Sequence, residues 1–172
     1  PIFLEKVFSA TDSIKTYLTA GILILSGAGS LIFGKIADKK GTKITLSIIL
    51  LAWIILFPML AFAQSLTTAA IICLIAGLFY GPVWSVSRAM VSEFTPRAIE
   101  ARSFSFYTLA ERFATIIGPI TWSVVLVTTA SSGNASYSYA MLGLAALIVL
   151  GFLFIRKIKP TNISDNNQST SQ

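Results

Sequence analysis

Residues 34–43 read GKIADKKGTK and separate two long apolar stretches. TAGILILSGAGSLIF (residues 19–33) precedes them, and ITLSIILLAWIILFPMLAFA (residues 44–63) follows. Four lysines and one aspartate lie between these stretches, with a glycine at the start of the segment and another near its end. A short basic segment of this kind is typical of an aqueous connection between two membrane-spanning helices.

The distribution of charge predicts how many spans the chain contains. The 172 residues are 55% hydrophobic and only 12% charged, and the mean hydropathy is +0.78, whereas soluble domains are about 25% charged. Residues 44–87 and 113–155 carry no charge. Each run is about twice the ~20 residues that one membrane helix needs, and each has a polar break, at residues 63–68 and 128–136.

We therefore predict an all-α, polytopic membrane protein with five transmembrane helices. The expected spans are residues 17–36, 42–63, 68–94, 103–129 and 137–155. Residues 1–16 would form an extracytoplasmic loop or the end of a preceding helix, 17–157 a transmembrane bundle, and 158–172 a disordered cytoplasmic tail. Buried helices of a soluble protein are the alternative, but they need charged outer faces that the second and fifth spans lack.

Basic residues alternate between the connections and so predict the orientation. The connections after the first and third spans, and the segment after the fifth, contain several lysines or arginines, while the second and fourth connections contain none. The positive-inside rule then places the N-terminus outside and the C-terminus in the cytoplasm. The net charge of +6 reflects this topology. We expect no nucleic-acid partner, because these loops lack interleaved aromatic residues.

Composition also argues against most catalytic chemistry. The sequence has no histidine and a single cysteine, Cys73, and no pair of Cys, Asp or Glu has the spacing of a metal site. We expect no metal, no cofactor and no enzymatic activity. The chain begins with Pro1 rather than Met, and we expect further transmembrane helices of the same protein upstream.

The second and fifth spans are apolar all round and suit lipid, whereas the other three carry polar features. The first has a stripe of small residues at Ser26, Ser30 and Gly34, which allows close helix packing. The third has a predicted kink at Gly81-Pro82. The candidate pathway residues near that kink are Tyr80, Trp84, Ser85 and Arg88.

The fourth span has a second predicted kink, at Gly118-Pro119, and contains Tyr107, Glu111 and Arg112. The two charged residues lie about 15 Å along the helix beyond Arg102. Ionisable groups at that depth usually face a cavity or a partner, so both are candidates for the substrate pathway or for coupling. The alternative is that the helix begins later and both side chains extend to the headgroups.

The segment at residues 34–43 resembles the cytoplasmic motif of the major facilitator superfamily, G-x-x-x-D-[RK]-x-G-[RK]-[RK]. Gly34, Asp38, Lys39, Gly41 and Lys43 match this motif, and Thr42 replaces a basic residue. The glycines would allow a tight turn. The aspartate would cap a helix or meet the positive N-terminus of another one. The resemblance implies a cytoplasmic gating element.

Residues 87–96, 100–107 and 112–119 are similar to the late helices of one branch, the vacuolar amino-acid effluxers of autophagy and their bacterial relatives. The chain departs from that branch at Trp84, Glu111 and Arg112. The resemblance implies helices 8 to 12 of a twelve-helix secondary transporter in a bilayer, with a small-molecule substrate moved by alternating access. It also implies amino-acid efflux as a candidate activity and a bacterial inner membrane as the location.

Two other readings stay open. A facilitator-like receptor or scaffold without transport would keep the helix framework. Alternatively, the five spans are helices 2 to 6 of a transporter's first half, with the polar C-terminal segment starting the central loop.

Overall fold

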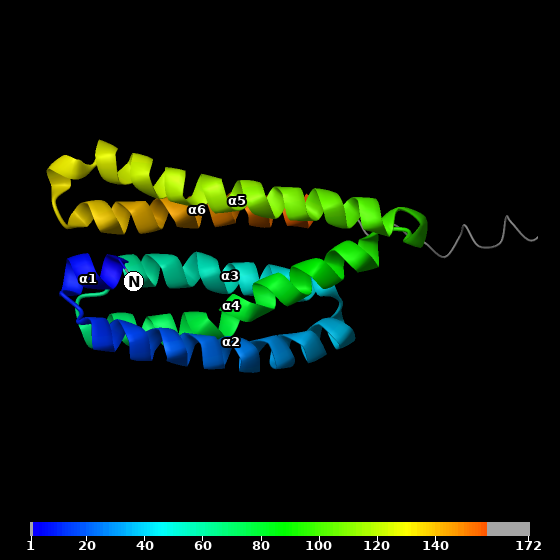
Figure 1. Ribbon diagram of the computed structural model, residues 1–172, viewed down its shortest axis with the longest axis horizontal. Helices are drawn as coiled ribbons and strands as arrows, with labels where there is room; N and C mark the ends of the chain where they lie inside the picture. Colours follow the sequence, from blue (N-terminus) through cyan, green and yellow to red (C-terminus); the bar gives the residue numbers. More distant parts are fainter. Residues whose placement is uncertain (1, 158–172) are drawn as a thin grey trace, which may run out of the picture.

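The computed structural model describes residues 2–157, and every regular element in that range is helical (Figure 1). The elements are α1 (Ile2–Phe8), α2 (Asp12–Lys40), α3 (Thr42–Ala61), α4 (Leu66–Phe94), η1 (Arg97–Ile99), α5 (Glu100–Thr128), η2 (Ala130–Ser132) and α6 (Ala135–Lys157). Five of these helices are long and apolar enough to cross a membrane, which confirms the five-span prediction. The predicted tail, 158–172, lies outside the described residues.

The observed helices extend beyond the predicted spans mainly at their polar ends. Residues 12–16, assigned from sequence to a preceding segment, form the first turns of α2, and α5 begins at Glu100 rather than at residue 103. Residues 2–8 are also helical. Polar residues lower the hydropathy of these ends without interrupting backbone hydrogen bonding, so a search based on apolar runs stops too early.

The connections with lysine or arginine all lie at one end of the bundle. The α2–α3 turn, the α4–α5 turn and the C-terminal end of α6 share that end, while α1 and the α3–α4 and α5–α6 connections share the other (Figure 1). The ammonium of Lys43 donates a hydrogen bond to the carbonyl oxygen of Arg156 at 3.3 Å. The charge alternation in the sequence thus corresponds to two distinct ends of the molecule.

The turn between α2 and α3 is a single residue, Gly41, although the motif contains two glycines. Helix α2 continues through Gly34 and Asp38 to Lys40, past the predicted end of the first span at residue 36. Only Gly41 breaks the helix, with a φ of 87°. Its N–H donates to the carbonyl oxygen of Ala37 at 2.8 Å. A positive φ is easy for glycine and costly for other residues, which explains a one-residue turn here.

Helices α2 and α4 approach closely through small residues. A Cβ atom on Gly29 would overlap the backbone carbonyl of Leu78, and one on Gly81 would overlap Ser26 and Ser30. Gly34, by contrast, has open space at its Cβ position. The predicted small-residue stripe therefore packs through Ser26, Ser30 and the intervening Gly29.

The kink positions lie inside continuous helices. Pro82 is within α4 and Pro119 within α5, and α4 changes direction part-way along its length (Figure 1). Proline lacks the N–H that would bond the carbonyl four residues earlier. In α4 that carbonyl belongs to Leu78, the group against which Gly29 packs.

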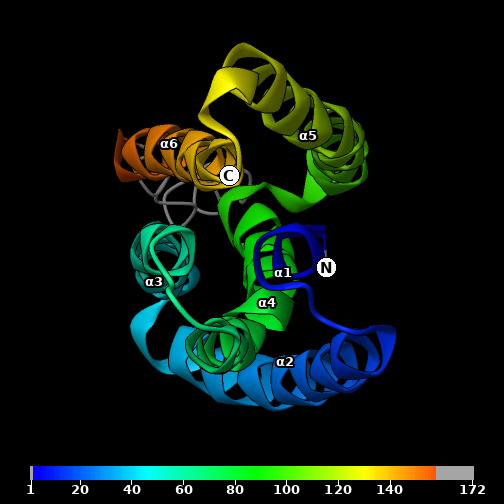
Figure 2. The same cartoon turned by 90° about the vertical axis from the view of Figure 1, so that its left-hand side faces the viewer.

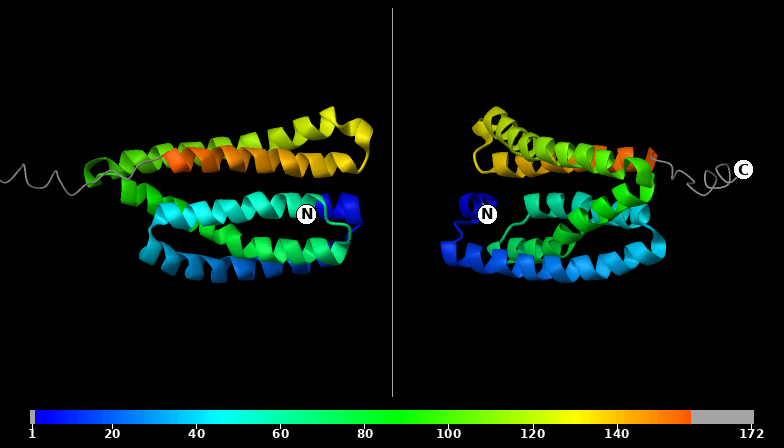
Figure 3. Two further views of the ribbon diagram at one scale, coloured as in Figure 1. Left: turned by 180° about the vertical axis from the view of Figure 1, so that it is seen from behind. Right: turned by 45° about the vertical axis from the view of Figure 1, so that its right-hand side comes forward.

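Helix α3 joins two parts of the bundle. It packs against α4 on one side and α6 on the other, as the view from behind shows (Figure 3). Its buried residues include Thr45, Leu46 and Ile49, whereas α5 has no buried residue among those described. Apolar composition therefore did not identify the most exposed span. Helix α3 is apolar but buries several residues, whereas α5 is more polar and buries none of those described.

Helix α5 packs on α6 and meets α4 only sparsely. Seen from the end, α1 lies between α4 and α5 (Figure 2). There Phe3 and Leu4 of α1 are buried in a core that includes Leu18, Ala69 and Met141. Along the rest of their length, α4 and α5 are connected mainly by the polar contacts described next.

Candidate functional site

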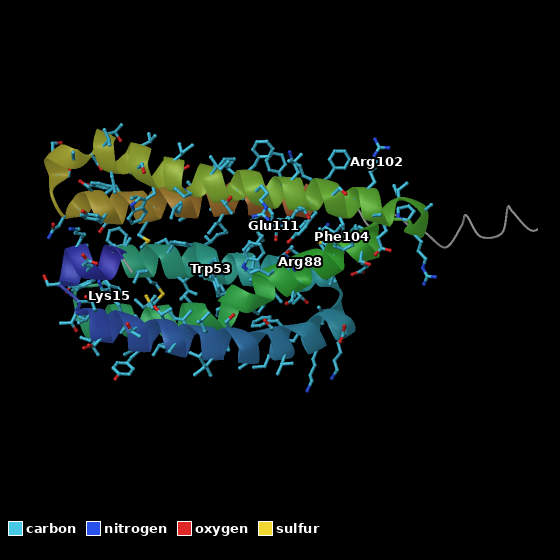
Figure 4. The ribbon with its side chains drawn as sticks, in the orientation of Figure 1. Lys15, Trp53, Arg88, Arg102, Phe104 and Glu111 are labelled. Carbon is cyan, nitrogen blue, oxygen red and sulfur yellow. The ribbon has the colours of Figure 1, made fainter. Side chains whose placement is uncertain are left out.

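Two helices that barely pack against each other are linked by polar side chains. The guanidinium Nη2 of Arg88 on α4 lies 3.2 Å from Oε1 of Glu111 on α5. One turn away on α5, the hydroxyl of Tyr107 lies 2.8 Å from that of Ser87. Figure 4 shows Arg88 and Glu111 directed toward each other between the two helices. The structure thus brings together three of the predicted pathway residues: Arg88, Tyr107 and Glu111.

Glu111 lies near the middle of α5, whereas Arg88 lies closer to the basic end of α4. Helix α5 has 29 residues and is about 44 Å long, enough to cross the hydrocarbon and both headgroup regions. Glu111 and Arg112 are about 17 Å from its first residue, close to its middle. The helix therefore begins before the predicted residue 103, while the alternative that both side chains extend toward the headgroups stays open.

Arg112 lies on a different face of α5 from Glu111. Adjacent residues on a helix point about 100° apart. Glu111 is half-buried against α4, whereas Arg112 is exposed, and no hydrogen bond or ion pair joins its guanidinium to another residue within 2–157. The two neighbouring charges consequently have separate roles in the geometry, one paired and one unpaired.

Tyr80 and Trp84 line an apolar cavity of about 280 Å³ between α3, α4 and α6. Trp53 and Phe57 of α3 contribute to it, and their rings are 5.3 Å apart. The indole N–H of Trp53 (Figure 4) is buried, and no residue of the described range accepts its hydrogen bond. Ser85 turns away into its own helix and donates to the carbonyl oxygen of Pro82 at 3.4 Å.

At the basic end of the bundle, the carboxylate that meets the start of α3 is Glu93. Thr42, the first residue of α3, donates to Oε2 of Glu93 at 2.6 Å. A carboxylate is favourable at a helix N-terminus. Asp38 and Lys39 are exposed on the last turn of α2. Sequence reasoning missed Glu93, whose only signal was an acidic residue at the end of the third span.

The described residues contain no cluster of three or more His, Cys, Asp or Glu side chains that could hold a metal ion. What the arrangement offers instead is an ion pair and a hydrogen bond between two membrane-length helices, together with an aromatic cavity.

The sequence matches the family model of the Major Facilitator Superfamily over residues 1–171. The chain belongs to this superfamily. It is accordingly an integral, multi-pass membrane protein of a transporter and efflux-pump family. No solved structure shows a significant match.

Several curated relatives are similar over most of the chain. An uncharacterized protein of Aquifex aeolicus is 29% identical over 159 residues, covering 92% of this chain and 40% of that protein. A proton-coupled antiporter flippase, LtaA, of Staphylococcus epidermidis is 28% identical, covering 91% and 42%. A multi-drug resistance efflux pump PmrA homolog of Lactococcus lactis is 24% identical, covering 90% and 38%. The chain thus spans about two fifths of the length of these relatives.

Proposed function

We propose that this chain is part of a secondary active transporter that moves a small solute by alternating access. The observation that carries the proposal is the Arg88–Glu111 pair, a 3.2 Å contact between two helices that are each long and apolar enough to cross a membrane. Ionised groups within membrane-spanning helices are costly and usually serve a pathway or a coupling step. Carriers bind their substrate near the midplane between helices that move relative to each other.

We propose amino acids as the substrate and efflux as the direction of transport. The support for both is the similarity of residues 87–96, 100–107 and 112–119 to the amino-acid effluxer branch. Two of the relatives are named as an efflux pump homolog and an antiporter flippase, which also favours active transport across a membrane. Glu111 would act in proton coupling, and Asp38 with its loop would gate the cytoplasmic side.

The rest of the transporter would complete the bundle. Further transmembrane helices of the same protein would cover the side of the bundle where α1 lies between α4 and α5 (Figure 2). Lipid would cover the outer faces. The bacterial sources of the relatives favour a bacterial inner membrane. The basic end of the bundle would face the cytoplasm.

The test is efflux from proteoliposomes that contain the native full-length protein and labelled amino acids. Wild type should release at least one amino acid when a proton gradient is imposed. Glu111→Gln should abolish coupled efflux, and Asp12→Asn, at the opposite end of the bundle, should not. Coupled efflux in Glu111→Gln would remove the proton-coupling role. Movement of other solutes but of no amino acid would overturn the substrate class and leave transport standing.

A further inference from the structure

Helix α5 has three distinct faces, which follow from its 100° rotation per residue. The first face packs: Tyr107 and Glu111 contact α4, and Thr121 and Val125 lie against Gly143 of α6. The other two faces are exposed in the described chain and differ sharply in chemistry.

The second face is apolar. Its residues fall within a sector of about 100°, and all are at least half exposed: Phe106, Leu109, Phe113, Ile116, Ile117, Ile120, Val124 and Val127. A surface of this kind suits lipid or the apolar side of another membrane helix.

The third face is a polar stripe, within a sector of about 80°. Its residues are Ser105, Thr108, Arg112, Thr115 and Ser123, and all are exposed. They occur over five turns of the helix, with Arg112 near its middle. The same sector also contains Pro119 and Leu126, so the stripe is continuously polar from Ser105 to Thr115 and continues further along the helix with Ser123.

The hydroxyl protons of the polar stripe are largely used within the helix. Ser105 donates to the carbonyl oxygen of Ala101 at 3.0 Å, Thr108 to Phe104 at 2.9 Å, and Thr115 to Arg112 at 2.6 Å. Their oxygens stay available as acceptors for water. The charged donor on this face is the Arg112 guanidinium. The neighbouring carboxylate of Glu111 lies on the first face and is paired with Arg88.

A guanidinium part-way along a membrane helix, with no ion-pair partner among residues 2–157, needs an anion or water beside it. Arg112 is about 18 Å along α5 from Glu100, so a lipid headgroup would meet this need only if the side chain extended toward the basic end of the helix. Guanidinium has a planar array of donors that binds carboxylate oxygens in pairs. A solute that travels along the polar stripe would bring such a group to Arg112.

We propose that the polar stripe of α5 lines the aqueous path of the carrier and that Arg112 binds the carboxylate of the transported solute. The assignment rests on the transport function proposed above and narrows its substrate to organic anions and zwitterions with a carboxylate. The paired Arg88 does not compete for the carboxylate while Glu111 is ionised.

The first experiment tests the aqueous path. Single cysteines are placed at Thr108 and Thr115 on the polar stripe and at Phe113 and Ile120 on the apolar face, in a Cys73→Ala background of the native full-length protein. N-ethylmaleimide should label the polar-stripe positions about tenfold faster or more, because the reactive thiolate forms in water. Equal rates on the two faces would overturn the proposed path.

The second experiment tests Arg112 as the carboxylate site. Labelling of Thr115→Cys is measured in vesicles of zwitterionic lipid with added L-leucine, L-glutamate or benzoate. It is measured again with leucinamide and benzamide, in which an uncharged amide replaces the carboxylate. At least one carboxylate should slow labelling several-fold, while its amide should not. Arg112→Gln should remove the protection, and Arg112→Lys should keep part of it. Basal labelling of each variant checks that the helix is still in place.

Three outcomes would overturn the site: no carboxylate protects, protection survives in Arg112→Gln, or inorganic phosphate alone protects. Protection that appears only after anionic lipid is added would assign Arg112 to lipid instead. Transport in the same vesicles separates the two proposals. Arg112-dependent protection without any solute movement would refute the transport function, whereas transport that does not depend on Arg112 would refute this site alone.

Discussion

The guanidinium of Arg88 and the carboxylate of Glu111 join two helices that otherwise make little contact, at a distance of 3.2 Å. The side chain of Glu111 is 20% exposed and that of Arg88 is 57% exposed. Helix α3 packs against α6 and so holds the α5–α6 hairpin on one side. The ion pair and the Ser87–Tyr107 hydrogen bond hold α5 to α4 on the other.

Exchange of the two charges tests whether this pair stabilises the bundle. Arg88→Glu and Glu111→Arg should each lower the thermal stability of the purified protein, because each places like charges together. The double exchange should recover most of the loss, with a coupling free energy of about 0.5–3 kcal/mol in the cycle. Additive single and double effects would show that the contact contributes nothing to stability.

Gly29 should not tolerate a side chain. Gly29→Ala puts a Cβ atom into the backbone carbonyl of Leu78, and overpacking of this kind costs about 1–3 kcal/mol or more. Gly27→Ala is the matched control, because its Cβ position is open and alanine favours helix by about 1 kcal/mol. Thermal unfolding in detergent should therefore shift down for the first variant and stay equal or rise for the second.

The Thr42–Glu93 hydrogen bond should help to hold the basic ends of α3 and α4 together. Thr42→Val removes the hydroxyl that donates to Glu93 at 2.6 Å and should cost about 1–3 kcal/mol, since hydrogen bonds to charged groups are stronger than neutral ones. Thr42→Ser should retain most of the stability. Ser47→Ala removes a hydroxyl bonded within α3 and serves as the control. Chemical denaturation that ranks the valine and serine variants equally would contradict this assignment.

The link between α1 and α2 should weaken in acid. Lys15 donates a hydrogen bond to Glu5 at 2.6 Å and lowers the pKa of that carboxyl group. A carboxyl group with a lowered pKa in the folded state stabilises the protein above its unfolded pKa, about 4.3. This contribution is lost as the pH falls through the lower, folded value.

Stability measured against pH for wild type and Glu5→Gln checks this prediction. The two proteins should differ at neutral pH, with wild type the more stable, and should converge as the pH falls below about 4. A difference that persists unchanged into acid would mean that the Glu5 carboxylate does not act through its charge.

Much of the architecture was predictable because a bilayer imposes simple rules. A helix must satisfy its own backbone hydrogen bonds in lipid, so apolar runs of a given length become spans. Residues 44–87 and 113–155 each gave two spans in this way. Charge alternation assigned connections to ends, and the structure places the basic connections together. The family was predicted from the motif at residues 34–43 and is confirmed by the family match.

The partners of individual side chains were not predictable. Sequence spacing puts Glu111 and Arg112 at the same depth, but only the rotation of α5 against α4 decides that Glu111 meets Arg88 and that Arg112 does not. Gly29 and Glu93 were likewise hidden, since their roles depend on Leu78 and Thr42, which are distant in sequence. Local composition determines which segments become helices, whereas the contacts between helices depend on packing that only the tertiary structure decides.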